Sequence, residues 1–123
     1  MAREKYDTGT VTFETTEAIP LGSLVKYDAA GTVTIADVTE EAIGTASEIG
    51  YAAGQRIGVD LFNKPGTHIG IAAAAIVKGA VIYGRNAGEI DDNNADSALR
   101  VGRSLETATA QGDEIMFLVD RPL

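Results

Sequence analysis

The feature that most constrains the fold of this chain is an internal duplication. Residues 18–62 contain short apolar runs, a glycine-containing turn and an alternating apolar run, and residues 75–119 repeat this order. The second copy starts 57 residues after the first, and the offset becomes 58 by Gly102, the counterpart of Gly44. Two copies are too few for a solenoid. We therefore expect a single β-domain, residues 17–123, with internal pseudo-twofold symmetry.

The positions that are identical in both copies are glycines and small or apolar residues, with one glutamate. They include Ala18, Ile19, Gly22, Ala30, Gly31, Gly44, Glu48, Gly54 and Ile57. Glycine at a turn supplies a positive φ without steric cost, and apolar residues at fixed spacing fill a core. The shared positions are therefore scaffold, and we expect function at the positions that differ.

The chain is a succession of short apolar runs separated by turn signals. Fourteen glycines and many Thr, Val and Ile residues favour strands and tight turns over helices. We expect strands at residues 8–16, 24–27, 32–35, 42–47, 55–62, 67–72, 79–83, 89–90, 99–105 and 113–119. The acidic residues 36–41 are compatible with one helical turn. The pattern predicts an all-β fold, a small barrel or sandwich.

Composition and charge exclude several classes of function. A chain of 123 residues is long enough for one domain with its own core. Its formal net charge of −8 opposes binding to a phosphate backbone, so we expect no nucleic-acid partner. The absence of cysteine excludes disulfides and cysteine-ligated zinc. The first residues lack the apolar core of a signal peptide, and the apolar run 69–83 is too short to cross a membrane.

The N-terminal sixteen residues differ in character from the rest. Residues 1–7 are polar and charged, and we expect a flexible arm. Residues 8–16 then alternate, with Val11 and Phe13 on one face and threonines on the other. The pattern indicates an edge strand that is able to pair with another chain. We therefore assign residues 1–16 to an arm and edge strand that precede the duplicated domain.

A single tripeptide invites a catalytic interpretation. Asp7-Thr8-Gly9 matches the motif of aspartic proteases, in which two such aspartates share a proton. Here it follows a polar terminus instead of a buried strand, and the second copy has no matching triplet. A match of three residues without its structural context carries little weight. We expect the protein to have no catalytic residues and not to be an enzyme.

Metal and cofactor sites are also not expected. The acidic stretch 91–96 offers oxygen ligands, but it lacks the alternate spacing, central glycine and terminal glutamate of a calcium loop. His68 is the sole histidine and has no cysteine or nucleophile motif to act with. Its expected role is structural or at an interface. No glycine-rich phosphate-binding motif occurs.

The differences between the copies point to an interaction surface. The outward residues of the first closing strand are Arg56, Gly58 and Asp60, and their counterparts are Glu114, Met116 and Leu118. Lys26 likewise corresponds to Tyr83. An apolar outer face predicts a contact between proteins, here an oligomer interface through Tyr83, Met116 and Leu118. The open alternative is that the segment 67–75 of the same chain covers Met116 and Leu118.

Three motifs carry a family resemblance. They are Ala-Ile-x-x-Gly-x-x-Val-x-Tyr-x-Ala-Ala-Gly-x-Val at 18–33, Ala-Ile-Gly-x-Ala at 42–46 and Ala-Ala-Gly-Gln-x-Ile-x-Val at 52–59. With them the chain resembles the capsid cement, or head-decoration, proteins of tailed bacteriophages. The resemblance extends in size and order from Thr8 to the C-terminus. It implies a small β-barrel or β-tulip-like domain with a flexible N-terminal arm.

The resemblance also implies a mechanical function without cofactors. Proteins of this family bind the outer surface of the expanded head, usually as homotrimers, and bridge neighbouring capsomers. Their arm adds a strand to the major capsid protein. Carried to this chain by position, that role implies capsid contacts through Tyr6, Thr8, Val11 and Phe13. The protein would be made in the host cytoplasm and end on the outer surface of the virion.

Two other functions remain open from the sequence. The first is a stand-alone bacterial β-barrel that serves as an adaptor or binds a ligand. The second is an aspartic-type hydrolase that uses Asp7, which the context of the motif disfavours.

Overall fold

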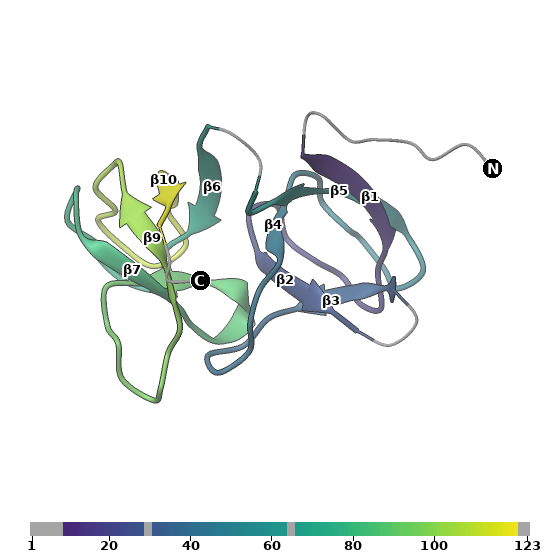
Figure 1. Cartoon of the computed structure of the whole chain (residues 1–123), viewed down its shortest axis with the longest axis horizontal. Helices are drawn as coiled ribbons and strands as arrows, with labels where there is room; N and C mark the ends of the chain where they lie inside the picture. The colour runs from purple at the N-terminus through teal and green to yellow at the C-terminus, as the bar shows by residue number, and fades with distance from the viewer. Residues whose placement is uncertain (1–8, 29–30, 64–65, 121–123) are drawn as a thin grey trace.

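The computed structural model describes residues 9–28, 31–63 and 66–120, which form ten strands and a short 3-10 segment, η2. Figure 1 shows them as two lobes side by side, with the N-terminal half of the chain in one and the C-terminal half in the other. The elements are β1 Thr10–Glu14, β2 Leu24–Tyr27, β3 Val33–Ile35, β4 Gly44–Ala46, β5 Arg56–Leu61, β6 His68–Ile71, β7 Val81–Gly84, η2 Asn86–Gly88, β8 Ile90–Asp91, β9 Arg100–Ser104 and β10 Glu114–Val119.

The two lobes have the same topology. The first sheet has the order β1-β5-β4-β2-β3 and the second the order β6-β10-β9-β7-β8, with every neighbouring pair antiparallel. Strands one to five therefore correspond in order to strands six to ten. The all-β class and the duplication that the sequence predicts are confirmed.

The duplication starts earlier in the chain than residue 18. β1 occupies in the first sheet the place that β6 occupies in the second. The register agrees, since Phe13 lies opposite Ile57 and the corresponding Gly70 lies opposite Ile115. The five residues 10–14 and their counterparts 67–71 share only the first residue, threonine, so this part of the repeat cannot be recognised from sequence identity. β1 is thus a strand of the first lobe as well as the end of the N-terminal segment.

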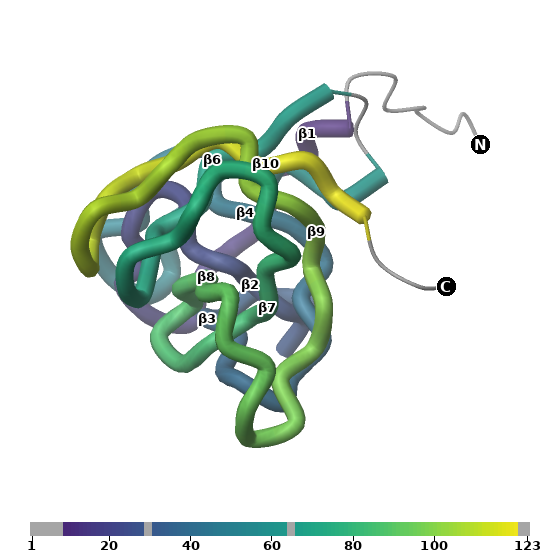
Figure 2. The backbone as a smooth tube through the Cα atoms, turned by 90° about the vertical axis from the view of Figure 1, so that its left-hand side faces the viewer, coloured from purple at the N-terminus to yellow at the C-terminus, as the bar shows by residue number. Residues whose placement is uncertain are grey.

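Each sheet closes on itself into a small barrel. Thr15, which follows β1, forms a parallel bridge to Val33 of β3, and Ala72, which follows β6, forms the equivalent bridge to Ile90 of β8. The two strands at the ends of each sheet are thereby joined. Figure 2 shows the barrels from the side of the second copy, which lies in front of the first.

The expected helical turn at residues 36–41 is wrong. The segment forms a hydrogen-bonded turn, in which the Glu40 amide donates to the Asp37 carbonyl at 3.0 Å and the Glu40 carboxylate accepts from the Asp37 amide at 2.9 Å. Only eight residues separate β3 from β4. Val38 and Thr39 are β-branched, and such residues lose side-chain freedom in a helix. A local carboxylate bond replaces helical hydrogen bonding here.

The glutamate that both copies share has the same structural role in each. The Glu48 carboxylate accepts a hydrogen bond from the Gly58 amide of β5 at 2.8 Å. The Glu106 carboxylate accepts one from the Met116 amide of β10 at 2.7 Å. A strand donor that has no ladder partner would cost free energy if buried, and the carboxylate satisfies it. The identity of these glutamates is therefore scaffold.

The shared Gly44 and Gly102 are required by close backbone contacts. A Cβ atom on Gly44 would lie 2.2 Å from the carbonyl oxygen of Asp60, and one on Gly102 would lie 1.9 Å from that of Leu118. Real Cβ atoms do not approach so closely, so only glycine allows β4 and β9 to lie this near β5 and β10.

The apolar cores of the two barrels are unequal. The first core lies within the first barrel and consists of Ile19, Val25, Val33, Ala46, Ile57 and Val59. The second core contains the equivalent residues Ile76, Ile82, Ile90, Ile115 and Phe117, together with Val101, Ala72 and Ala108. It also includes Leu24, Ala36, Ala42 and Phe62 of the first copy. The second core therefore continues across the junction and joins the barrels.

The sole histidine lies at this junction. His68 of β6 is 2% exposed, and its Nδ1 lies 3.3 Å from the hydroxyl of Thr45 on β4. Its ring stacks on Phe117 and meets Phe62 edge to face, with 5.6 Å between centroids in both pairs. The side chain therefore packs one barrel against the other.

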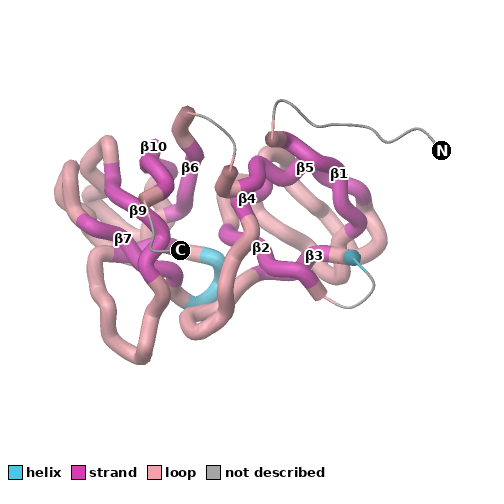
Figure 3. The backbone as a smooth tube through the Cα atoms, viewed as in Figure 1, coloured by secondary structure: helices cyan, strands magenta, loops and turns pink. Residues whose placement is uncertain are grey.

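The segment η2 docks on the first barrel through its backbone, and Figure 3 shows it between the lobes. The Gly88 amide donates to the Ala36 carbonyl at 3.0 Å, and the Ala87 amide donates to the Asp37 carboxylate at 3.0 Å. In return the Val38 amide donates to the side-chain oxygen of Asn86 at 3.2 Å. These three bonds fix the orientation of the second barrel on the first.

The two copies meet through different positions. Gly88 has a φ of +70°, and a Cβ there would lie 2.9 Å from the Leu24 carbonyl. Its counterpart Gly31, with a φ of +80°, has nothing within 4 Å of the equivalent position. A twofold axis would pair equivalent positions on both sides. The contact between the two copies is therefore heterologous.

The two equivalent glycines provide a matched test of the junction. Gly31→Ala places an alanine in the left-handed region, which costs about 1–2 kcal/mol. Gly88→Ala adds a clash with the first barrel, and overpacking costs roughly a further 1–3 kcal/mol. We expect chemical denaturation to show a clearly larger loss of unfolding free energy for Gly88→Ala. Equal losses in the two variants would contradict the role of Gly88 in the junction.

Candidate partner-binding surface

The residues proposed for the N-terminal contact are partly used within the first barrel. Val11 and Phe13 lie on the inner face of β1, opposite the buried Val59 and Ile57. Phe13 packs on the first core and meets Tyr27 edge to face at 5.6 Å. Both side chains are half-buried, so only their exposed parts are open to a partner while these contacts are kept. Tyr6 and Thr8 lie outside the described residues.

The residues proposed for an oligomer interface lie on the outer face of the second barrel. Met116 and Leu118 point outward from β10, and Tyr83 points outward from β7, two strands away. Met116 lies opposite Ile69 and is half-buried, whereas Leu118 is 44% exposed. β6 pairs beside β10 in the sheet and leaves Leu118 uncovered.

A different apolar surface lies between the barrels. Four of the eight large apolar side chains that are exposed in the described part of the chain line two adjoining hollows there: Leu21, Ile49, Tyr51 and Ile69. The larger hollow has a volume of about 650 Å³ and the smaller about 270 Å³. Leu21 and Glu114 line both, so the two hollows lie side by side. We call this surface the inter-barrel groove.

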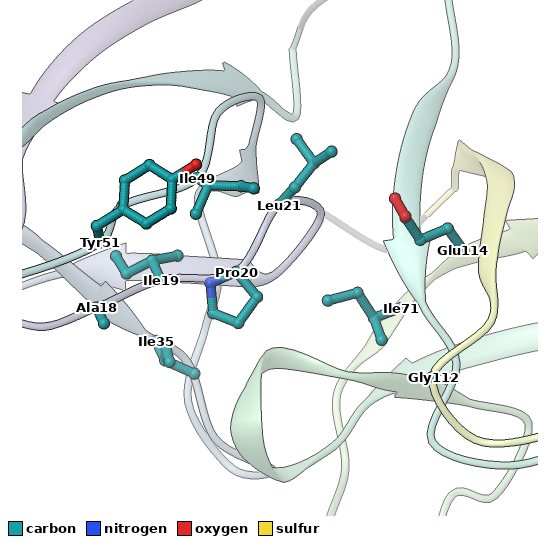
Figure 4. A pocket seen from close by; sticks show the side chains of 11 residues that line it. Ala18, Ile19, Pro20, Leu21, Ile35, Ile49, Tyr51, Ile71, Gly112 and Glu114 are labelled. Atoms are coloured by element: carbon teal, nitrogen blue, oxygen red, sulfur yellow. The ribbon is translucent and has the colours of Figure 1, made fainter.

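The groove takes side chains from both barrels. In Figure 4, Leu21, Ile49 and Tyr51 lie on the side of the first barrel, and Ile71 and Glu114 lie on the side of the second. The groove gathers exposed apolar groups at a hollow, whereas the exposed Val77 and Leu99 line neither hollow.

The loops that carry these side chains are held by backbone hydrogen bonds. Gly50, between Ile49 and Tyr51, exchanges two bonds of 2.8 Å with Ile19. The Gly22 amide, next to Leu21, donates to the Ala46 carbonyl at 2.9 Å. Gly22 has a φ of +86°, and its α-carbon faces Ile69 and Ile71 closely enough that a Cβ would lie 3.4 Å from both. The groove is therefore formed by ordered segments.

The charged groups that line the groove are acidic. Glu114 and Asp60 line it, and no lysine or arginine does. The Asp60 carboxylate accepts a hydrogen bond from the Thr10 hydroxyl at 2.6 Å. Glu114 makes no ion pair within the described parts of the chain. In the first copy the equivalent cross-strand pair is Glu14 and Arg56, but here Ile71 lies opposite Glu114.

The groove was not predicted from the sequence. Apolar gains in the second copy predict a surface at Met116 and Leu118. The opposite departures mark the groove: Leu21, Ile49 and Tyr51 have the polar counterparts Lys78, Thr107 and Thr109. Apolar residues that occur in turns of the first copy and not of the second therefore indicate the groove in the sequence.

Two aspartates have perturbed pKa values, in opposite directions. Burial of Asp91 at the end of β8 raises the pKa of its carboxyl; the hydrogen bond from the Asp92 amide opposes this, and the Asp92 carboxyl adds to it. Hydrogen bonds from the Thr109 amide and hydroxyl and from the Ala110 amide lower the pKa of Asp113. No group of three or more acidic or histidine side chains in the described regions could hold a metal ion.

These shifts predict opposite pH dependences for two neutral variants. The unfolded pKa of aspartate is about 4. The pKa of Asp91 is higher in the folded than in the unfolded state, so its ionisation destabilises the fold as pH rises above about 4. Asp91→Asn should therefore become more stable relative to the parent protein in that range. The Asp113 carboxylate stabilises the fold above about pH 4 and loses this effect as pH falls through its lowered folded pKa, so Asp113→Asn should be costly at neutral pH only.

Unfolding midpoints at about pH 3 and about pH 7 check this pair. Each variant removes one negative charge, so the change in net charge cancels in the comparison. The same sign of pH dependence in both variants would contradict the assignment.

The described strands define a class of protein, a chain of two small antiparallel barrels joined head to tail. No helix in the described residues has the length and apolar character that crossing a membrane requires. No protein-family model matches the chain, and none of the curated proteins matches it.

A solved structure shares the fold. It is described as the head fiber gp8.5 N base in bacteriophage phi29, and the match has a TM-score of 0.73 at 16% sequence identity. The match covers 91% of this chain and 93% of that one. Nearly the whole of each chain therefore takes part. The fold expected from the resemblance to phage head proteins is confirmed, because a phage head protein has it.

Proposed function

We propose that this protein is a structural component of a bacteriophage head. The observation that carries the proposal is the shared fold with the head fiber base of phage phi29, over almost the full length of both chains. The three sequence motifs at 18–33, 42–46 and 52–59, which resemble head-decoration proteins, support the same class separately. The role is mechanical and uses no catalytic group or cofactor.

In its finer form, the proposal is a decoration protein of the outer surface of the expanded head. The N-terminal segment adds a strand to the major capsid protein, and a homotrimer bridges neighbouring capsomers. β1 leaves room for this contact, since its residues 10–14 pair only with β5 among the described strands and the bridge that closes the barrel begins beyond them, at Thr15. Strand addition needs such an edge and makes little demand on sequence.

The mechanism would be avidity. Each added main-chain hydrogen bond contributes on the order of 1 kcal/mol net. A trimer presents three such strands at once, so the second and third contacts form at a high effective concentration. The net charge of −8 suits a surface that faces away from packaged DNA.

The position of β1 determines how the arm is tested. Removal of residues 1–16 would delete a strand of the first barrel, so the truncation has to stop at residue 8. We expect the full-length protein, and not the truncated one, to co-sediment with expanded heads assembled from the major capsid protein of the same genome. Copies bound per head, measured by mass, should come in multiples of three.

The control for this truncation is its stability. Unchanged chemical denaturation would show that the first barrel is intact. Full occupancy by the stable truncated protein would overturn the arm contact, and no binding by the full-length protein would overturn the proposed function.

A second candidate rests on the inter-barrel groove. Its larger hollow, about 650 Å³, has the size of sites that bind small ligands, as in a bacterial adaptor or ligand-binding barrel. The hydrolase alternative depends on Asp7, which lies outside the described residues, and requires a peptidase activity that Asp7→Asn abolishes.

A further inference from the structure

We propose that the inter-barrel groove binds an extended segment of a partner protein that carries an arginine or lysine between two apolar side chains. The inference deepens the proposed function, because it adds a contact to the one made by the N-terminal segment. It concerns only the groove residues and can be tested without phage heads, so the two proposals can fail separately.

The apolar character of the groove requires an apolar partner. Leu21, Ile49, Tyr51 and Ile69 are all exposed, and Tyr51 is 75% exposed. They lie with Ile71 around two adjoining hollows whose walls come from both barrels. Contiguous exposed apolar surface of this kind marks an interaction site. Aromatic residues such as Tyr51 are enriched at such sites.

The division of the groove into two hollows fits an extended chain. In a strand, alternate side chains point to the same face and are spaced by roughly 7 Å. A large side chain can enter the hollow beside Tyr51 and Ile49, and a smaller one the hollow beside Thr45 and Ile69. The side chain between them on the same face then lies at Glu114, which lines both hollows.

Charge selects the middle side chain. Docking an apolar segment removes water from Glu114, and a carboxylate that is buried without a partner is costly. No basic side chain lines the groove to compensate it. An arginine or lysine from the partner would supply the cation, whereas a glutamate there would be repelled. The charge of the groove therefore favours a basic residue in the partner segment.

The order of the groove supports binding without rearrangement. Its walls are held by the paired bonds between Ile19 and Gly50 and by the contact of Gly22 with β6. A surface that is ordered before binding loses less conformational entropy on association. The junction between the barrels, which includes His68, holds the two walls together.

The test uses a capped heptapeptide, Gly-Phe-Thr-Arg-Thr-Val-Gly, as the probe. Its Phe, Arg and Val side chains share one face when it is extended, and an analogue has Glu in place of Arg. We expect the Arg peptide to shift backbone amide NMR signals of the full chain at Leu21, Ile49, Tyr51 and Ile71. Its affinity should exceed that of the Glu peptide at least about tenfold, a difference of about 1.4 kcal/mol.

Matched variants assign the preference to the groove. Glu114→Lys should reverse the preference between the two peptides, whereas Glu14→Lys, with the same change in net charge on the other barrel, should not. Tyr51→Ser should weaken binding of both peptides, and Val77→Ser, an exposed site outside the groove, should leave it unchanged. Retained dispersion of the amide spectrum shows that each variant is folded.

Several results would overturn the proposal. They are signal shifts that map elsewhere, equal affinity for both peptides, or an unchanged preference in Glu114→Lys. Concentration-dependent shifts at the groove without peptide would assign it to a second copy of the chain. Shifts there on removal of residues 1–8 would assign it to the N-terminal segment of this chain.

Discussion

The structure depends on the apolar contact through which the second barrel completes its core with residues of the first. Leu24, Ala36, Ala42 and Phe62 are buried in that shared core, and His68 packs against the edge of it. Full burial of a side chain such as leucine or phenylalanine contributes roughly 1.5–3 kcal/mol. The contact also places Gly22, the neighbour of Leu21, beside Ile69 and Ile71, so the inter-barrel groove exists only while the junction is closed.

The junction explains why the two copies have diverged where they have. Gly84 of the second copy lies against Leu24, and a Cβ there would approach the leucine to 3.3 Å. Its counterpart in the first copy is Tyr27, which is exposed and too large for the same contact. A heterologous contact can repeat from chain to chain without closing. Because Tyr27 takes the place of Gly84, the first copy of one chain cannot dock on another chain in the way that the second copy docks on the first within this chain.

Much of the fold follows from local patterns that can be recognised in the sequence. Glycines such as Gly22, Gly54 and Gly112 have positive φ values at turns. The alternation in β5 and β10 matches the burial of Ile57, Val59, Ile115 and Phe117. The equivalence of β1 and β6 could not be predicted from the sequence. The two strands occupy the same place in their sheets, but almost all their residues differ.

The candidate site was less predictable for a physical reason. Its residues come from turns of one copy and strands of the other, and they meet only because η2 and His68 fix the relative position of the barrels. Periodicity within a strand contains no information on that relation. Met116 is an apolar strand residue whose counterpart in the first copy is Gly58. Leu21 and Tyr51 instead lie in loops of the first copy, and their counterparts in the second copy are polar.

Native-state hydrogen exchange of the full chain, followed as a function of denaturant, tests most directly whether the barrels form one unit. A shared core predicts that buried amides of both barrels, such as Val25 and Val59 in the first and Ile82 and Phe117 in the second, exchange with one common free energy of opening. Two separate values, with one barrel opening while the other stays protected, would contradict the account.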